Sequence, residues 1–400
     1  MLTFFLFLQL ISAVDAQNFN KNFASQVAEF ADINSGSKNL AGLIKLANKV
    51  APEFKKLGFK TEWNLNKRYL SAVRKPAKPR FTFLLVYHLD TVFEADHAFQ
   101  KAKIISEKKE GAAVLSGPGV IDDKGGLVLI LELLRAFQKL PENEQIEWKV
   151  FGAADEETGS ELSKSSLIEF AKGATLGLVF EPGWFDEPSN SIRIPMSVGG
   201  NAHLYWKVKG IESHAGINFE KGRSAIRALA EHILFFENLT NPKRELYFNV
   251  GQITGGTKLN VRPGEAEFRA AIRFRYESDE KFIEKSVEEA LEKFQKDGIK
   301  IQSELFFRWH PQTIASADLF QKMQKAASEL GQRIPEPAVS LARSGSSILA
   351  AAGIPTLDAM GPYGSGYHSD KEVLYLSSAL PRLRLIEKFL LNEMNTEKIK

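Results

Sequence analysis

The sequence predicts an α/β protein with a mostly parallel sheet flanked by helices, interrupted by a smaller inserted α+β domain. Two observations favour this fold class. Helical and strand patterns alternate between about residues 20 and 195, which is typical of βαβ units. Between 197 and 309 the strands instead alternate polar and apolar residues, as half-exposed strands do, and the first pattern resumes afterwards.

The first part of the chain supplies the helices and buried strands of the α/β domain. Apolar residues recur every three or four positions in FASQVAEFADI and NLAGLIKLANKVAPEFKKLG, which predicts two helices. Compact apolar runs rich in aromatic and β-branched residues predict strands buried on both faces, namely FTFLLVY, IEWKVFGAA and TLGLVFE. The apolar stretch from Lys124 to Leu140 predicts a long helix between two of these strands. This order indicates parallel strands joined by helices.

The inserted segment has the order β-α-β-β-α-β of a ferredoxin-like unit. Its predicted strands are NAHLYWKVKG, ELYFNVGQIT, GEAEFRAAIRFRY and IKIQSELFF, and its predicted helices are GRSAIRALAEHILFFENL and DEKFIEKSVEEALEKFQKDG. The α/β pattern then continues through DLFQKMQKAASELG, GIPTLDAMG and SSALPRLRLIEKFLLNEM. We therefore expect one α/β domain over 17–196 and 310–400, and an inserted domain over 197–309.

The composition excludes several classes of protein. Of the 400 residues, 44% are hydrophobic and 25% are charged, as in ordinary globular proteins. A net charge of +3 with scattered Lys and Arg gives no reason to expect a nucleic-acid partner. No apolar stretch beyond the first residues predicts a membrane span. The chain has no cysteine, so any metal must be held by His, Asp and Glu.

The first residues, MLTFFLFLQLISAVDAQN, are typical of a secretory signal peptide. An apolar run leads to the small-x-small pattern Val14-Asp15-Ala16, although no Lys or Arg precedes the run. We expect a signal peptide over 1–16, a mature chain from about Gln17, and a secreted or periplasmic protein. A buried N-terminal helix is the alternative.

Side chains that can bind metal follow the ends of predicted strands. His88 and Asp90 come directly after FTFLLVY, and Glu156 and Glu157 follow IEWKVFGAA. The remaining members of this set are Asp122 and Asp123, at the entry of the long helix, Glu181 after TLGLVF, and His368. Because ligand sites form at the carboxyl ends of parallel strands, we expect these side chains to converge on one crevice. A solvated strand end would explain any single one of them, but not the joint pattern.

This set of side chains favours metal-assisted hydrolysis. Imidazoles and carboxylates without thiolates suit Zn²⁺, with Mn²⁺ or Co²⁺ as alternatives. The number of carboxylates favours two ions that share a bridging ligand, roughly 3.5–4 Å apart, which activate a water and polarise a carbonyl. In the pair Glu156 and Glu157, one side chain can bind metal while the other accepts the proton of the water. We expect His97, His203 and His232 to be surface or structural residues.

The same stretches resemble a known family. HLDTVF, GPGVIDDKGG, DEETGS, FEPG, SHAG and GYHSDKEV occur in the order and spacing of the zinc-dependent aminoacylase and carboxypeptidase family. The resemblance covers essentially the whole mature chain and is strongest to the bacterial glutamate carboxypeptidases. It implies a fold of the zinc-peptidase type, in which the inserted domain is a lid and dimerisation domain, and therefore a homodimer.

The resemblance also implies a metal ligand set. Asp122 would bridge two zinc ions. His88 and Glu181 would complete one metal site, and Glu157 and His368 would complete the other.

Further roles follow from the resemblance for residues that do not bind metal. Glu156 would be the general base, and Asp90 would accept the second N–H of His88 and so fix its tautomer. His214 would stabilise the oxyanion of the tetrahedral intermediate, from its own chain or from a partner subunit. Asn260 and Arg273 would hold the carboxylate of the substrate.

Two segments differ from the glutamate carboxypeptidase pattern. In LARSGSSILAAAGIP, Gly345 or a serine stands where that branch has Thr-Asp, and Arg343 adds a charge nearby. In RWHP, His310 replaces a second Arg. The sequence therefore predicts the metal chemistry, but not a preference for C-terminal glutamate.

We expect a dizinc hydrolase that releases the C-terminal amino acid from a peptide or from an N-acyl amino acid with a free carboxylate. An N-acyl or N-succinyl amino-acid deacylase is the alternative within the same class, although biosynthetic deacylation is cytoplasmic and the expected signal peptide argues against it. A non-catalytic binder that keeps the fold is the alternative outside that class.

Overall fold

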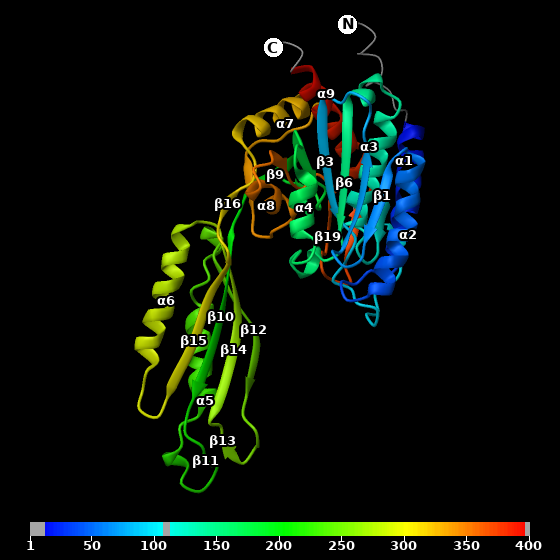
Figure 1. The fold of residues 1–400 in the computed structure, drawn as a ribbon. Coiled ribbons are helices and arrows are strands. Elements are labelled where there is room, and N and C mark those ends of the chain that lie inside the picture. The colour runs from blue at the N-terminus through cyan, green and yellow to red at the C-terminus, as the bar shows by residue number, and fades with distance from the viewer. Residues whose placement is uncertain (1–12, 107–112, 397–400) are drawn as a thin grey trace. The chain divides into compact units, whose positions relative to one another are not determined.

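The structure is a computed structural model that describes residues 13–106 and 113–396. It divides into two compact units, shown in Figure 1. The first unit contains Met1–Met196, Ile314–Ala338 and Arg343–Lys400, and the second contains Ser197–Thr313 and Val339–Ala342. Each unit is described in turn.

The first unit is built on a six-stranded sheet with the order β1-β2-β6-β3-β7-β18. The strands are β1 (Lys60–Asn64), β2 (Tyr69–Arg74), β3 (Phe81–His88), β6 (Ile146–Ala153), β7 (Leu176–Val179) and β18 (Thr356–Leu357). Strands β6, β3, β7 and β18 run parallel, whereas β1 and β2 join the edge antiparallel. The mostly parallel sheet predicted from the apolar runs is confirmed.

Helices cover both faces of this sheet because alternate residues of its strands point to opposite sides. Leu85 and Tyr87 of β3 lie in one core, whereas Leu84 and Val86 lie in the other. Residues of α1 (Ala13–Ala31), α2 (Leu40–Lys56), α3 (Lys124–Phe137), α7 (Ala317–Glu329) and α9 (Ala379–Thr396) form the first core. Residues of α4 (Lys164–Ala171) and α8 (Gly345–Ala351) form the second core.

Short elements complete the first unit and form the chain segments that lead into the second. A small sheet has the order β19-β20-β5-β4 and consists of β4 (Lys103–Ser106), β5 (Ala113–Ser116), β19 (Gly364–Ser365) and β20 (Val373–Tyr375). Another small sheet has the order β16-β9-β17, with β8 beside β9, and consists of β8 (Trp184–Asp186), β9 (Ser191–Val198), β16 (Gln312–Thr313) and β17 (Pro337–Ser340). Three 3-10 turns are η1 (Pro141–Gln145), η2 (Glu156–Thr158) and η5 (Leu376–Ser378). Turn η2 holds the two adjacent glutamates directly beyond β6.

The second unit has the predicted β-α-β-β-α-β order. Its antiparallel sheet β12-β14-β10-β15 consists of β10 (Gly200–Lys209), β12 (Tyr247–Gly255), β14 (Glu265–Phe274) and β15 (Lys300–Trp309). Helices α5 (Ala225–Glu237) and α6 (Ser278–Phe294) supply the other half of its core, around Trp206, Phe236 and Phe268. A two-stranded ribbon of β11 (Ser213–His214) and β13 (Val261–Arg262) and the 3-10 turns η3 (Phe219–Lys221) and η4 (Pro242–Arg244) complete it.

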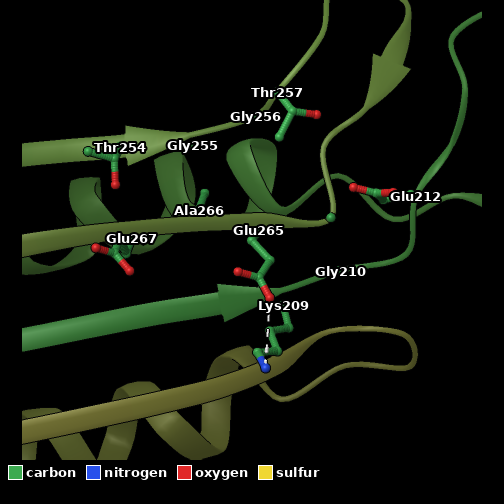
Figure 2. Close-up of a pocket in the computed structure, with 11 residues that line it drawn as sticks. Lys209, Gly210, Glu212, Thr254, Gly255, Gly256, Thr257, Glu265, Ala266 and Glu267 are labelled. Carbon is green, nitrogen blue, oxygen red and sulfur yellow. Dashed lines mark ion pairs between the residues drawn. The ribbon is translucent and has the colours of Figure 1, made fainter.

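A cavity of about 590 Å³ lies where β10 and β12 end and β14 begins (Figure 2). Gly256 and Thr257 line it and lead into the loop that carries Asn260. Lys209 and Glu265 also line it, and the Lys209 ammonium lies 3.7 Å from a carboxylate oxygen of Glu265. Glu265 lies closer to Lys207, at 2.9 Å, so its carboxylate is shared between two lysines.

The limits of the second unit differ from the predicted 197–309. Residues up to Thr313 belong to it because β16 pairs with β9, with Gln312 opposite Val198. Val339–Ala342 also belong to it, and the Gly199 N–H donates to the Ser340 carbonyl at 2.7 Å. A two-residue strand has no periodicity that a sequence pattern could reveal.

Most of the predicted signal peptide lies outside the described residues. Helix α1 begins at Ala13, so cleavage after Ala16 would remove its first turn. The buried residues Phe23, Val27 and Phe30 would remain in the core. Within the described part of the chain, each helix is too short or too polar to cross a membrane.

Candidate metal centre

The imidazole of His88 lies at the end of β3. Its Nε2 is 2.8 Å from Oδ1 of Asp122 and 4.0 Å from a carboxylate oxygen of Glu181. Its Nδ1 is 3.1 Å from the backbone carbonyl oxygen of Asp90 and 3.5 Å from the Asp90 carboxylate. Because a carbonyl can only accept, Nδ1 carries a proton and Nε2 faces the other ligands. Asp90 was predicted to orient this ring through its carboxylate, and of its two contacts with Nδ1 the main-chain oxygen makes the shorter one.

The carboxylate of Asp90 is fully buried and holds turn η2. One of its oxygens accepts the backbone N–H of Glu156 and the other accepts that of Glu157, each at 3.1 Å. The hydroxyl of Ser37 donates to it at 2.8 Å. Burial alone would raise the pKa of Asp90, but His88 and these donors keep it lowered. One carboxylate therefore positions the backbone of both glutamates.

Asp122 lies between the two histidines. While Oδ1 faces His88, Oδ2 lies 3.2 Å from Nε2 of His368. The same nitrogen of His368 lies 3.2 Å from a carboxylate oxygen of Glu157. A carboxylate whose two oxygens face different imidazoles has the geometry of a bridging ligand.

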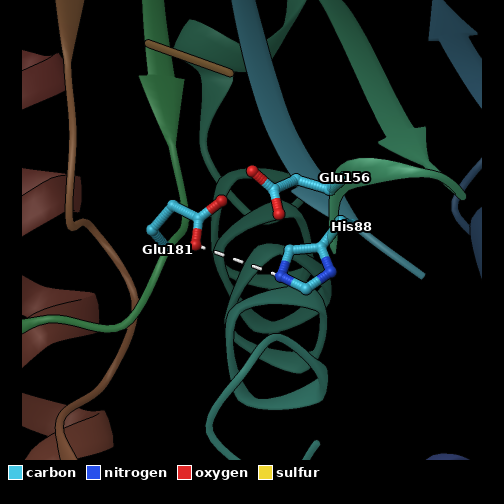
Figure 3. A group of neighbouring side chains, drawn as sticks. All are labelled: His88, Glu156 and Glu181. Carbon is cyan, nitrogen blue, oxygen red and sulfur yellow. Dashed lines mark ion pairs between the residues drawn. The ribbon is translucent and has the colours of Figure 1, made fainter. Parts of the chain in front are cut away.

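The described residues contain two groups of ligand atoms that lie within 4.8 Å of one another. One group is His88, Glu156 and Glu181, whose carboxylates point toward the same space beside the imidazole in Figure 3. The other is His88, Asp122 and Glu157, next to His368. The structure thus brings together the five predicted ligands and the predicted base.

The electrostatics of this cluster fit a cation site. Burial raises the pKa values of Glu156 and Glu181 well above the usual range, and neighbouring carboxylates raise them further. Hydrogen bonds to Asp122 and Glu157 raise the pKa of His368 to about 10. A bound cation stabilises the ionised form of crowded carboxylates whose pKa values are raised in this way. Imidazole nitrogens and carboxylate oxygens are also the donor atoms that zinc, manganese and cobalt accept.

Buried charged groups support the ligands, and of these Lys124 and Glu372 were not predicted from the sequence. The carboxylate of Glu372 accepts the backbone N–H groups of Gly119, Ile121 and Asp122 at 3.0–3.2 Å. Asp123, joined to Asp122 by a cis peptide bond, accepts the N–H of His88 at 3.2 Å. The ammonium of Lys124 donates to the Leu89 carbonyl at 2.8 Å. Asp123, Lys124 and Glu372 adjoin predicted motifs, but no pattern in the sequence marks them as buried.

The segment LARSGSSILAAAGIP, which lacks the Thr-Asp of the glutamate carboxypeptidases, contacts a carboxylate from another part of the chain. Asp358 follows β18, and the hydroxyls of Ser344 and Ser346 both donate to one of its oxygens at 2.6 Å. Asp358 lies inside the predicted strand GIPTLDAMG, and a carboxylate within an apolar run was the available signal for it. His310, the other departure, pairs with Glu280 at 2.8 Å.

His214 and Asn260 lie together in the second unit. His214 pairs with Val261 across the β11–β13 ribbon, and the Ala215 N–H donates to the Asn260 carbonyl at 3.0 Å. The Nδ1 atom of His214 accepts two backbone N–H groups at 3.1 Å, from Gly216 and Ile217. The proton of a neutral ring is therefore on Nε2, and the ring is exposed.

Arg273 lies at the other end of the same sheet. It is opposite Asn201 of β10, and its guanidinium lies 5.1 Å from the Trp309 ring centre. The ribbon with His214 adjoins the Glu265 end of β14, and the eight positions from there to Arg273 span about 26 Å. The second unit therefore does not bring Arg273 together with His214 or Asn260.

Comparison with known proteins gives consistent matches. Residues 84–392, more than half of the chain, match the model of peptidase family M20/M25/M40. Carboxypeptidase G2 from Pseudomonas sp. (strain RS-16) is 26% identical over 363 residues, which cover 88% of this chain and 85% of that protein.

Solved structures share the fold. Human carnosine dipeptidase 1 matches with a TM-score of 0.73 and 14% identity, over 94% of this chain and 96% of its own. A dinuclear metal-binding peptidase of the M20 family from Bacillus subtilis matches with a TM-score of 0.66 and 13% identity, over 95% and 99%. The predicted zinc-peptidase fold is confirmed.

Proposed function

The chain belongs to peptidase family M20/M25/M40, and on that basis we propose that it is a dizinc hydrolase that releases the C-terminal amino acid of a peptide or an N-acyl amino acid. Family membership supports a metal-dependent hydrolase. The observation that carries the dinuclear proposal is Asp122, whose two oxygens face His88 and His368.

The residues of the cluster divide between two ions. His88 and Glu181 would hold one ion, Glu157 and His368 would hold the other, and Asp122 would be shared between them. Bound there, two zinc ions would polarise the scissile carbonyl and activate a water, and Co²⁺ or Mn²⁺ would substitute.

Glu156 is the proposed proton carrier. It accepts a proton from water as the water oxygen bonds to the carbonyl carbon, and it returns that proton to the nitrogen as the C–N bond breaks. The products are a free amine and a carboxylic acid, which loses its proton to solvent at neutral pH. Burial holds the pKa of Glu156 well above the usual carboxyl range.

The positions of His214 and Arg273 favour a homodimer. His214 would donate its exposed Nε2–H to the oxyanion, and the fork of Arg273 would pair with the substrate's carboxylate. Because about 26 Å of β14 separates the two ends of the sheet, one copy cannot place both side chains on one small substrate. We therefore assign His214, with Asn260, to the substrate of the partner subunit.

Export from the cytoplasm is part of the same proposal, because the apolar run and Val14-Asp15-Ala16 favour cleavage. The N-terminus of the secreted or periplasmic protein, measured by mass spectrometry, is expected at about Gln17. Retention of Met1 in a cytoplasmic protein would instead favour the deacylase alternative.

A hydrolysis screen tests the function. Purified mature chain with added Zn²⁺ is incubated with N-acyl and peptidyl amino acids of every C-terminal type. We expect one substrate group to be hydrolysed, and activity to fall about 10²–10⁴-fold in Glu156→Ala with bound zinc unchanged. Glu161→Ala, an exposed glutamate in the same loop, is the control. Two bound metals without turnover of any amide would contradict the proposal.

A further inference from the structure

A cavity of about 370 Å³ lies in the first unit, at the beginning of α9. The residues that define its character are Phe185, Ser189, Gln332, Tyr363, the buried Arg382 and the exposed Arg333. No residue of the metal centre lines it. The cavity is therefore distinct from the proposed metal centre.

Arg382 is the unusual group in this cavity. Its side chain is only 1% exposed, and Nε, Nη1 and Nη2 have no hydrogen-bond partner among the described residues. Burial lowers the pKa of Arg382 to about 10, so the guanidinium is still charged at neutral pH. A buried charge without a partner is strongly unfavourable, and buried guanidinium groups are normally paired with an anion.

The surrounding chain leaves room for this charge but does not neutralise it. A Cβ atom at Gly183 would lie 2.6 Å from Nη2 of Arg382, so a larger residue there would displace the guanidinium. Asp186, the nearby carboxylate of β8, accepts the Ser189 hydroxyl instead. Glu187, which follows it, is exposed. The chain thus provides a cradle for the cation without an ion pair.

The walls of the cavity combine aromatic and polar groups. The rings of Phe185 and Tyr363 stack in parallel, with centroids 4.8 Å apart and an interplanar angle of 5°. Gln332 donates to the Pro381 carbonyl at 3.1 Å, and its own Oε1 is buried without a partner in the described chain. The first turn of α9, which contains Arg382, adds the positive end of an 18-residue helix.

We propose that this cavity binds a small organic carboxylate, whose oxygens accept hydrogen bonds from Arg382 and whose apolar part packs against Phe185 and Tyr363. The planar fork of a guanidinium matches the two oxygens of a carboxylate, and one buried positive charge balances one negative charge. Inorganic phosphate shares the oxyanion chemistry, but it has no apolar part for the aromatic wall.

Isothermal titration calorimetry of the zinc-loaded full chain tests this proposal with three probes at constant ionic strength: benzoate, uncharged benzamide and inorganic phosphate. Arg382→Met removes the charge and keeps a long apolar side chain. Arg384→Met, two positions along the same helix and outside the cavity, is the matched control. We expect benzoate to bind the wild type and the control, and to bind Arg382→Met at least about tenfold more weakly. Benzamide should not bind.

Three results would overturn the proposal: no saturable binding of benzoate to the wild type, equal binding to Arg382→Met, or Arg382-dependent binding of phosphate alone. If Arg382→Met does not fold, a crystallographic measurement on the wild-type protein still tests the proposal. Crystals soaked in 4-bromobenzoate should show an anomalous bromine peak between Tyr363 and Arg382. Peaks at other positions only would reject the proposal. Neither experiment depends on hydrolysis, so a failed substrate screen would leave this test intact.

Discussion

A carboxylate oxygen of Glu372 accepts the backbone N–H of Asp122 at 3.2 Å, although 250 positions separate the two residues in the chain. Glu372 also accepts the N–H groups of Gly119 and Ile121, so it holds the whole turn that presents the bridging carboxylate. Asp122 therefore depends on a residue close to His368 in sequence. Two candidate ligands are placed by one segment.

Replacement of Glu372 by Gln should weaken metal binding. The amide nitrogen of Gln cannot accept an N–H, so part of the turn around Asp122 loses its acceptor. We expect about 10–100-fold lower zinc affinity or activity, as for other residues that orient metal ligands. Competition with a fluorescent zinc chelator measures the affinity. Asp370→Asn, an exposed carboxylate in the same segment, should change nothing, and equal effects of the two variants would refute the assigned role.

Metal removal should lower the thermal stability of the first unit. The carboxylates of Glu156, Glu157 and Glu181 would be crowded without a counter-charge, and binding stabilises the folded state by mass action. We expect a chelator to lower the unfolding midpoint by several degrees, and Zn²⁺ to restore it. The variant Asp122→Asn has a weaker bridging ligand, so the chelator should change its unfolding midpoint much less than it changes that of the wild type. An unchanged midpoint in the wild type would show that no stabilising metal was bound.

Two inactive variants should complement each other if His214 serves the partner subunit. In a mixed dimer of Glu156→Ala and His214→Ala, one site combines an intact Glu156 with the partner's intact His214, and the other site lacks both. Co-expression with two affinity tags isolates the mixed dimer, for which we expect about half of the wild-type activity per dimer. Activity no higher than that of either parent would place His214 in the site of its own chain.

His232 should make the second unit less stable in acid. Its Nδ1 accepts the indole N–H of Trp206 at 2.9 Å, and burial lowers its pKa to about 4 from an ordinary value of 6.5. The unfolded chain therefore binds a proton between these pH values while the folded chain does not. The free energy of unfolding of the second unit is therefore greatest above pH 6.5. It falls by on the order of 2 kcal/mol as the pH drops toward 4.

The variant His232→Gln tests this pH dependence, because it keeps an acceptor for Trp206 but cannot be protonated. Urea unfolding at pH 7.5 and pH 5 should show a smaller loss in the variant than in the wild type. His97→Gln, at an exposed histidine, should behave as the wild type does. Identical losses in all three proteins would show that His232 does not cause the effect.

Long periodic segments and strand ends could be predicted from the sequence. The run before His88 folds as β3, and Lys124 begins a buried helix, because apolar pattern and length both favour these elements. The convergence of His88, Glu156 and Glu181 could be expected because parallel strands end at one edge of a sheet.

Other features depended on tertiary structure that no local pattern contains. Lys124 and Glu372 look like surface residues in the sequence, and only the packing shows that they are buried and hydrogen-bonded. The separation of Arg273 from Asn260 depends on strand pairing, which the sequence leaves open. The segments beyond residue 309 joined the second unit through short pairings that have no periodicity.

The carboxylate of Asp90 has a consequence for how the proposed site responds to change. The carboxylate oxygens of Asp90 accept the backbone N–H groups of Glu156 and Glu157, and its carbonyl accepts from His88. The positions of the proposed base and of two proposed ligands therefore depend on one residue. A displacement of Asp90 would shift His88, Glu156 and Glu157 together and would not change their positions one at a time. Substitutions in the surrounding core should therefore leave the site either intact or lost, with few intermediate forms for gradual adjustment of the chemistry. Specificity would have to change elsewhere, among residues that do not touch Asp90.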